Sequence, residues 1–341
     1  MSLVENTSVI KGDLYTKYLE NEIEYFESIR QPEILIEEIA DNVNIGSNTL
    51  TGLSFPLCVV IEGLCALSSI YSSRKISLLK ELLTTYLYEN YKNYGFNYFN
   101  EGYIPLDLDT VSSMTRILGE KYPDVLNTYN DIIDRNLENN GLVPTWLDSD
   151  EHKHWCSGNS IFHIDVMLNY WLTEVKFKNS LDVELMKNAV ILKGLKNYWY
   201  IPSLYTPYLY FKLLNKSKLL NDVACLEPLV KALKDYSNDS NSYHARSNTS
   251  KIIIVQSLIK QNKCKMIDDV LFTAMSDSLS SRNNYGGIGI SSPKSTEVTL
   301  AGPPKNEVLY WSLRFQLYKS SITVRSFLLD CIITSMKDKI I

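Results

Sequence analysis

The sequence predicts an all-α fold, a single (α/α)6 barrel of about twelve helices arranged as antiparallel hairpins. Apolar residues recur at helical spacing along most of the 341-residue chain, and alternating strand patterns are few. Short turns join most of the expected helices, which places neighbouring helices antiparallel. No repeat of fixed period is present, and this counts against an open solenoid. No linker divides the chain, so we expect residues 1–341 to form one domain.

The expected helices follow one another from the N-terminus to the C-terminus. They cover residues 18–30, 32–43, 55–70, 77–91, 122–141, 160–175, 219–236, 250–263, 266–279, 306–320 and 321–339. The segment 122–141 begins near Pro123 and closes with Gly141, residues typical of helix starts and ends. The segment 55–70 is a long apolar run, but Glu62 interrupts it and it is too short to span a bilayer. We therefore expect it to be a buried helix.

Composition and charge narrow the classes of partner. Hydrophobic residues make up 45% of the chain and charged residues 21%, which indicates a globular protein. The net charge of −5, without a basic run, argues against a nucleic-acid partner, because phosphate binding needs a concentrated basic surface. The six cysteines form no Cys-X-X-Cys pair, and the first residues lack the apolar stretch of a signal peptide. We therefore expect a cytoplasmic protein with reduced thiols.

Two aspartates, Asp107 and Asp109, lie one residue apart in the apolar segment "YIPLDLDTVSSM" (103–114), where a helix-like run begins. One interpretation is structural: Asp107 caps the helix, and Asp109 in the first turn favours the helix dipole. The other interpretation is chemical. A carboxyl group in an apolar setting is poorly solvated when it is ionised, so its pKa rises. The aromatic residues before the pair are Tyr94, Phe96, Tyr98, Phe99 and Tyr103.

A neutral carboxylic acid beside an apolar substrate can protonate a carbon–carbon double bond. An ordinary aspartic acid has a pKa of ~3.9, so only about one molecule in a thousand is protonated at pH 7. To raise that pKa to about 7, the surroundings of the carboxyl group must disfavour its ionised form by roughly 4 kcal/mol. Aromatic faces would stabilise the resulting cation, and the helix N-terminus would stabilise the carboxylate that remains. The pair is therefore a candidate for acid catalysis in a site that excludes water.

Three segments carry a resemblance to a known family. The residues Asp-Leu-Asp-Thr at 107–110, within "PLDLDTVSSMTRIL" (105–118), resemble the Asp-X-Asp-Asp or Asp-X-Asp-Thr motif of class II terpene cyclases. The segment "FHIDVMLNYWL" (162–172) resembles the family's Asp-Val-X-X-Asn helix, and "YWYIPSLYTPYLYFKLL" (198–214) resembles its Tyr-X-Ser/Thr-X-X-Tyr segment. Their order and spacing match along most of the chain. With the length of one (α/α)6 domain, the chain is most similar to the single-domain class II cyclases that make meroterpenoids in cyanobacteria.

The resemblance implies a reaction and the residues that carry it. Asp109, the middle aspartate, would be the Brønsted acid that begins cyclisation of a lipophilic, polyprenylated aromatic acid. Asp107 and Thr110 would hold its proton in the right orientation, although Thr110 stands where the longer motif has a further Asp. The Gln-Trp repeats of squalene cyclases are absent. The mechanism requires no metal and no cofactor, because no diphosphate leaves. We also expect a monomer that makes transient contact with a membrane surface.

The other candidate site residues would orient the acid or bind substrate. His163 or Asp165 could orient Asp109 through a hydrogen bond, and Asn169 shares the helix face of Asp165 one turn later. For the aromatic candidates, an ordinary place in the core stays open as an alternative. The aromatic candidates for lining a substrate cavity are Tyr103, Trp146, Trp155, Trp199, Tyr205, Tyr208 and Trp311.

Two metal-dependent alternatives are weak. A class I cyclase would need an aspartate-rich magnesium motif beside Asn130, Asp134 and Glu138, and the chain has no Asp-Asp-X-X-Asp segment. A solvated helix face explains those three residues. A zinc site is the second alternative, but the spacing of its candidate ligands does not match one, and a surface loop with one helix histidine explains them. These candidates are His152, His154, Cys156 and His163.

Two further functions use the aspartate pair differently. A glycoside hydrolase or lyase on an (α/α)6 barrel would place two carboxylates ~5–10 Å apart across a sugar bond, in a polar cleft open to water. The apolar neighbours Leu106, Leu108 and Val111 count against such a cleft. A non-catalytic helical binding protein would use both aspartates as helix caps. A deep apolar cavity would favour the cyclase over both.

Overall fold

The computed structural model describes most of the first 238 residues and five residues near the C-terminus. The described residues are 16, 19–45, 48–100, 105–148, 162–177, 182–195, 205–219, 222–238, 322, 326, 329, 330 and 333. Residues 19–28 are helical. The elements that follow are α2 (Pro32–Ile39), β1 (Asp41–Ile45), β2 (Asn48–Gly52), α3 (Ser54–Ser68), α4 (Arg74–Tyr94), β3 (Leu106–Asp107), α5 (Leu108–Leu118), α6 (Pro123–Asn136), β4 (Trp146–Leu147), α7 (Ile164–Phe177), α8 (Val183–Lys193), α9 (Tyr205–Lys216) and α10 (Val223–Asn238).

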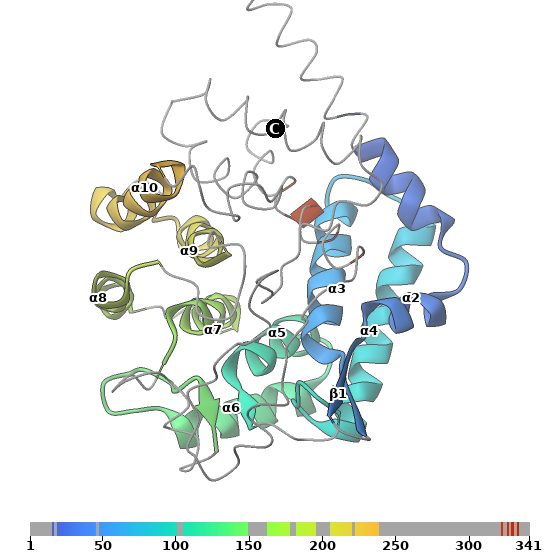
Figure 1. Cartoon of the computed structure of the whole chain (residues 1–341), viewed down its shortest axis with the longest axis horizontal. Coiled ribbons are helices and arrows are strands. Elements are labelled where there is room, and N and C mark those ends of the chain that lie inside the picture. Colours follow the sequence, from blue (N-terminus) through green and yellow to red (C-terminus); the bar gives the residue numbers. More distant parts are fainter. Residues whose placement is uncertain are drawn as a thin grey trace, which may run out of the picture.

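The helices lie in two concentric layers (Figure 1). Helices α3, α5, α7 and α9 form the inner layer, and each contacts the next one in the series. Helices α4, α6, α8 and α10 lie outside them, and each packs on the inner helix that precedes it in the chain. This succession of inner–outer hairpins confirms the predicted all-α barrel fold. The assignment of residues 1–341 to one domain stays a prediction.

Local sequence signals begin and end several of these helices. The Ser73 hydroxyl accepts a hydrogen bond from the backbone N–H of Ile76 at the start of α4, as an N-cap does. The carboxylate of Asp182 accepts a hydrogen bond from the backbone N–H of Leu185 at the start of α8. Gly95 follows the last residue of α4 and Gly194 follows that of α8, and both glycines have a φ of +66°. This left-handed conformation favours glycine, which explains why these helices stop there.

The structure corrects two of the predicted helix ends and adds two helices that were not expected. The helix expected over 32–43 ends at Ile39, because the alternating residues that follow form the antiparallel pair β1–β2. Helix α6 ends at Asn136, so Gly141 belongs to a turn after it and not to its C-terminus. Helices α8 and α9 were not among the expected helices. The helices expected between 250 and 320 lie outside the described residues.

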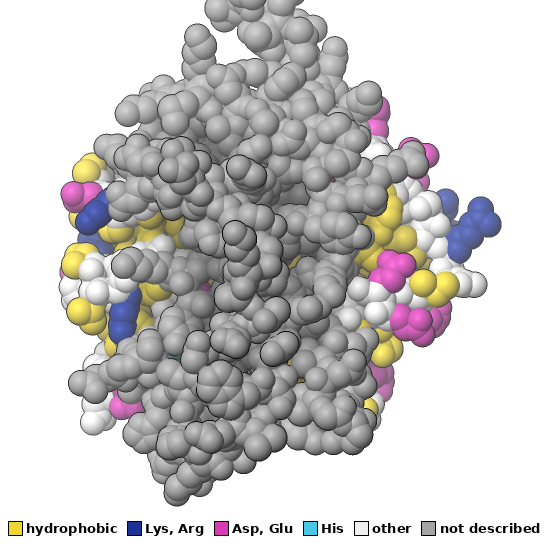
Figure 2. Space-filling view, viewed as in Figure 1, with side chains coloured by type: hydrophobic (Ala, Val, Ile, Leu, Met, Phe, Trp, Pro, Cys, Tyr) yellow, Lys and Arg dark blue, Asp and Glu magenta, His cyan; other side chains and the backbone are white. Residues whose placement is uncertain are grey.

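The long apolar run forms α3, and most of its side chains are buried, as predicted. Within the part of the chain that the structure describes, no helix is both long and apolar enough to cross a bilayer. Acidic, basic and apolar side chains are interspersed on the described surface that is visible in Figure 2. The buried core runs between the two helix layers and along the inner faces of α3, α5, α7 and α9.

Candidate active site

Asp107 is the N-cap of α5. Its backbone is extended, and its carboxylate accepts a hydrogen bond of 2.7 Å from the backbone N–H of Thr110. The residue also ends β3, which pairs antiparallel with β4 and sets Asp107 opposite Trp146. Asp107 therefore has the capping geometry that the structural interpretation predicted. Its position is fixed both by the helix that it starts and by the strand that it ends.

Asp109 lies in the first turn of α5 and is buried, with 3% of its surface exposed. The side-chain amide of Asn169, on α7, donates a hydrogen bond of 2.5 Å to Oδ1 of Asp109. The same amide nitrogen lies 2.7 Å from the hydroxyl of Ser113, one turn further along α5. The structure thus joins two candidate residues that are 60 positions apart in the chain. An uncharged donor faces the buried carboxyl group.

Thr145, just before β4, ties the starts of α5 and α7 together. Its carbonyl accepts a hydrogen bond of 2.9 Å from the backbone N–H of Leu108. Its hydroxyl accepts one of 2.8 Å from the backbone N–H of His163. These two bonds fix the position of α7 along α5. Asn169 of α7 therefore lies beside Asp109 of α5.

A chain of alternating charges continues from Asn169. Arg116, two turns after Asp109 on α5, donates from Nη1 to Oδ1 of Asn169 at 2.6 Å. Its Nε donates to Glu62 of α3, also at 2.6 Å. Lys212 of α9 lies 3.2 Å from the other carboxylate oxygen of Glu62 and 2.8 Å from Asp330. These charged side chains are at most 23% exposed. Each buried charge therefore has a partner of opposite sign, as burial requires.

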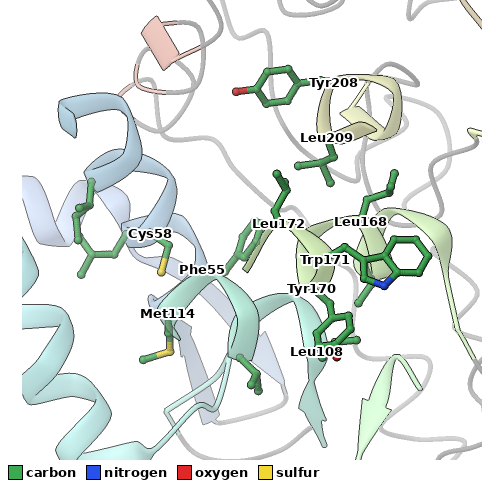
Figure 3. Packing of buried hydrophobic residues seen from close by; sticks show 14 of the residues in the cluster. Phe55, Cys58, Leu108, Met114, Leu168, Tyr170, Trp171, Leu172, Tyr208 and Leu209 are labelled. Carbon is green, nitrogen blue, oxygen red and sulfur yellow. The ribbon is translucent and has the colours of Figure 1, made fainter. Parts of the chain in front are cut away.

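A small cavity of about 20 Å³ lies beside this chain of charges. That volume holds about one water molecule. Phe55 and Cys58 of α3 face Tyr208 and Leu209 of α9 across this region (Figure 3). The full lining is Phe55, Cys58, Val59, Glu62, Ser113, Arg116, Tyr208, Leu209, Lys212 and Asp330. This space is therefore not the deep apolar cavity that we expect of a cyclase.

Burial shifts the pKa of several groups near the aspartate pair. It raises the pKa of Asp107 to about 6, although the hydrogen bonds from Thr110 oppose the shift. Burial, together with the charge of Lys193, lowers the pKa of His163 to about 3. His163 is therefore neutral at pH 7. Burial disfavours the ionised form of Glu62, but the charges of Arg116 and Lys212 outweigh it and hold the pKa of Glu62 well below its usual range.

The remaining predicted site residues are placed unevenly. Thr110 and Asp165 are buried, and Asp165 lies in the first turn of α7. Tyr208 is buried, and its hydroxyl donates to Asp330. Tyr205 begins α9, but its side chain is outside the described residues, as are Tyr103, Trp155, Trp199 and Trp311. The roles assigned to all of these residues stay predictions.

The metal-site candidates are only partly described. Helix α6 ends before Glu138, so this residue does not share a helical face with Asn130 and Asp134. His152, His154 and Cys156 lie outside the described residues. Among the residues that are described, no group of three His, Cys, Asp or Glu side chains is arranged to hold a metal ion.

Sequence reasoning missed the chain of charges behind Asn169. Glu62 was noted only as an interruption of an apolar run, and Arg116, Lys212 and Asp330 were not singled out. Each lies in a largely apolar helical segment, which indicates a buried charge in need of a partner. The partners are 54, 150 and 118 positions apart for Arg116–Glu62, Lys212–Glu62 and Lys212–Asp330, so only the fold identifies them.

Comparison with solved structures places the fold beside known enzymes. A variant of the type II terpene cyclase MstE from Scytonema, in complex with its substrate geranylgeranyl dihydroxybenzoate, has a TM-score of 0.62 and 12% identity, over 96% of this chain and 99% of that chain. A second MstE variant, in complex with its product merosterolic acid A, has a TM-score of 0.60 and 13% identity over the same shares. No family model and no curated protein matches the sequence.

An unsaturated glucuronyl hydrolase specific for heparin is a more distant structural neighbour. Its TM-score is 0.51 with 12% identity, over 97% of this chain and 98% of that chain. Both kinds of enzyme have α/α-barrel folds. The fold predicted from the sequence is therefore confirmed, and so is the resemblance in fold to single-domain class II terpene cyclases.

Proposed function

We propose that this chain is a class II terpene cyclase that protonates the terminal alkene of a polyprenylated aromatic acid. Asp109 is the acid in this proposal. The observation that carries it is the buried Asp109 at the N-terminus of an inner-layer helix, hydrogen-bonded to Asn169. The likeness of the fold to the type II terpene cyclase MstE, whose structures hold geranylgeranyl dihydroxybenzoate as substrate and merosterolic acid A as product, supports the proposal.

The first step transfers one proton from Asp109 to a terminal alkene carbon. The O–H bond of the carboxylic acid breaks, a C–H bond forms, and a tertiary carbocation remains on the neighbouring carbon. Successive alkenes then attack the cation and close the rings. Loss of a proton ends the reaction, so substrate and product are isomers. The N–H groups at the start of α5 and the amide of Asn169 stabilise the carboxylate that the first step leaves.

Asp107 and Thr110 support the acid in this mechanism. The N-cap bond between them holds the first turn of α5 in place and so fixes the direction of Asp109. Because the substrate is lipophilic, we propose that the enzyme meets it at a membrane surface. We also propose that the enzyme works as a monomer. His163, Asp165 and the predicted aromatic residues Tyr103, Trp199, Tyr205 and Trp311 would shape the site around the prenyl chain.

A product assay with matched variants tests the proposal. Purified protein is incubated with geranylgeranyl and farnesyl dihydroxybenzoate in the presence of EDTA, and products are separated from substrate by chromatography and analysed by mass spectrometry and NMR. We expect wild type to form a cyclised isomer of unchanged mass and Asp109→Asn to lose at least about 10³-fold in rate, because the acid is gone. Asp134→Asn, an exposed aspartate on α6, is the control and should match wild type. Equal turnover by wild type and Asp109→Asn would exclude Asp109 as the acid.

The likeness to the glucuronyl hydrolase supports a second candidate function, hydrolysis of an unsaturated glucuronyl sugar. The pair Asp107 and Asp109 would supply its carboxylates. The same preparations should therefore be offered an unsaturated glucuronyl disaccharide. Release of sugar by wild type, without any cyclised terpenoid, would favour the hydrolase over the cyclase.

A further inference from the structure

We propose that Arg116 is a positioning residue, which fixes the side-chain amide of Asn169 so that its NH2 group faces Asp109. The inference rests on the proposed role of Asp109 as an acid. Nothing in the sequence motif points to Arg116, which lies seven residues after Asp109. Seven residues are close to two helical turns, so both side chains leave α5 on the same side. Asn169 on α7 reaches both of them.

The guanidinium group holds the amide from one side. Nη1 of Arg116 lies 2.6 Å from Oδ1 of Asn169 and 3.1 Å from the hydroxyl of Thr173, one turn further along α7. The same nitrogen lies 3.4 Å from the backbone carbonyl of Asn169. Because a guanidinium group can only donate, it requires the carbonyl oxygen of the amide to point toward it.

Turning the amide over would therefore oppose like groups at both ends. The NH2 group would then face the donors of Arg116, and the carbonyl oxygen would face Oδ1 of the Asp109 carboxylate. In the observed orientation every one of these contacts pairs a donor with an acceptor. Arg116 thus selects one of two amide orientations that would otherwise have the same shape.

Arg116 is itself held by contacts from outside α5 and α7. Glu62 of α3 accepts from its Nε, and Lys212 of α9 and Asp330 continue the chain of charges. The side chain of Arg116 is 10% exposed. Two neighbouring inner helices, α3 and α7, therefore hold one guanidinium group. A side chain needed only for charge balance would not have to bond an uncharged amide.

The selected orientation has a chemical consequence for Asp109. Because Oδ1 accepts from Asn169, the neutral acid carries its proton on the other oxygen, Oδ2. After proton transfer the same amide stabilises the carboxylate. The amide of Asn169 bonds both the guanidinium and the carboxyl group, so Arg116 acts on Asp109 through this donor.

The test measures Asp109 directly in the full-length protein. Protein labelled with ¹³C at the aspartate carboxyl carbons is titrated by NMR, and the Asp109 signal is identified by its loss in Asp109→Asn. The titration midpoint is compared among wild type, Arg116→Lys, Asn169→Ala and the double variant. Arg116→Lys keeps the positive charge but not the planar fork that bonds both Asn169 and Glu62. Arg135→Lys, in an exposed ion pair with Asp148, is the matched control.

We expect Asn169→Ala to raise the titration midpoint of Asp109 by about one pH unit, because a donor to the carboxylate is lost. Arg116→Lys should raise it by about half a unit or more, and the double variant should equal Asn169→Ala alone. Arg135→Lys should match wild type. An Arg116→Lys midpoint equal to wild type, or an Arg116→Lys effect that persists without Asn169, would overturn the proposal. Should Arg116→Lys fail to fold, Arg116→Gln with Glu62→Gln removes both charges together and carries the same expectation.

Kinetics separate this inference from the proposed function. If wild type cyclises the substrate, Arg116→Lys should lower kcat about tenfold with KM unchanged, because a positioning residue acts through Asn169 and Asp109 and not on substrate binding. A fall in kcat/KM caused by KM alone would contradict positioning. If wild type forms no cyclised product, the proposed function fails, but the titration still decides whether Arg116 orients Asn169 toward Asp109.

Discussion

The two ends of α5 stabilise their buried polar side chains in different ways. At the N-terminal end, Asp109 is bonded to the uncharged amide of Asn169. Two turns later, Arg116 forms an ion pair of 2.6 Å with Glu62, and Lys212 continues the alternation of charge. A carboxyl group beside a cation is held ionised, whereas one beside a neutral donor can still take up a proton. The comparison suggests why one end suits an acid and the other suits a rigid support.

The largest expected effect comes from removing Glu62, the ion-pair partner of Arg116. Glu62→Ala leaves Arg116 and Lys212 as buried cations with one partner fewer, and we expect it to lower the free energy of unfolding by about 3–5 kcal/mol. Urea unfolding at pH 7 measures the change. Arg135→Ala removes one side of an exposed pair and should cost about 1 kcal/mol or less.

The pH dependence of that loss has a definite sign. The pKa of Glu62 is lowered in the folded protein, so its stabilising effect is present above the ordinary value of 4.5 and is lost as the pH falls below it. The difference between wild type and Glu62→Ala should therefore shrink in acid. A difference that stays constant down to pH 3 would show that Glu62 acts through packing and not through its charge.

An effect of intermediate size on stability is expected where Gly63 of α3 packs against Ser326. A Cβ atom on Gly63 would lie 2.5 Å from the backbone oxygen of Ser326. Backbone atoms cannot move aside easily, so Gly63→Ala should cost about 1–3 kcal/mol and displace the nearby Asp330 from Lys212. Thermal unfolding measures the cost, with the exposed Cys65→Ala on the same helix as control. An unchanged melting temperature would mean that Ser326 does not pack against α3.

The smallest expected effect concerns Asp107, the cap at the N-terminal end of α5. Burial raises the pKa of Asp107 to about 6 from its ordinary value of 3.8, so the folded protein loses stability as the pH rises through this window. Asn caps helices as well as Asp but does not ionise. We therefore expect the free energy of unfolding of wild type to fall by about 1 kcal/mol relative to that of Asp107→Asn between pH 4 and pH 7. The full shift would predict more, but Asp107 is partly exposed and solvent weakens the effect. Parallel urea curves at the two pH values check this, and a constant difference would contradict it.

Local sequence patterns were sufficient for most of the described helices and for singling out Asp109 as a candidate. Helical periodicity predicted the buried α3, and Pro105 with the Asp-X-Asp segment predicted a capped helix at α5. Helical spacing and the family resemblance together singled out Asn169. These signals are local, because a cap or an amphipathic face depends on residues within a few positions. The pattern did not reveal the end of α2, where a strand pair competes with the helix for the same residues.

The charged contacts behind Asp109 could not be predicted in the same way. Arg116 and Glu62 are 54 positions apart, and Lys212 and Asp330 are 118 positions apart. No local spacing specifies such pairs, because their distance depends on how three inner helices pack together. A charged residue in an apolar segment indicates that a partner exists but does not identify it.

The most direct test of the proposed chemistry is the reaction in deuterium oxide with EDTA present. If Asp109 protonates the terminal alkene, its acidic hydrogen comes from solvent, and the cyclised product should carry one deuterium fixed on a ring carbon. NMR of the product locates that deuterium, and mass spectrometry counts it. A product that carries one deuterium in wild type, and is not formed by Asp109→Asn, is the predicted result. A cyclised product without deuterium, or one formed equally by Asp109→Asn, would contradict protonation by Asp109.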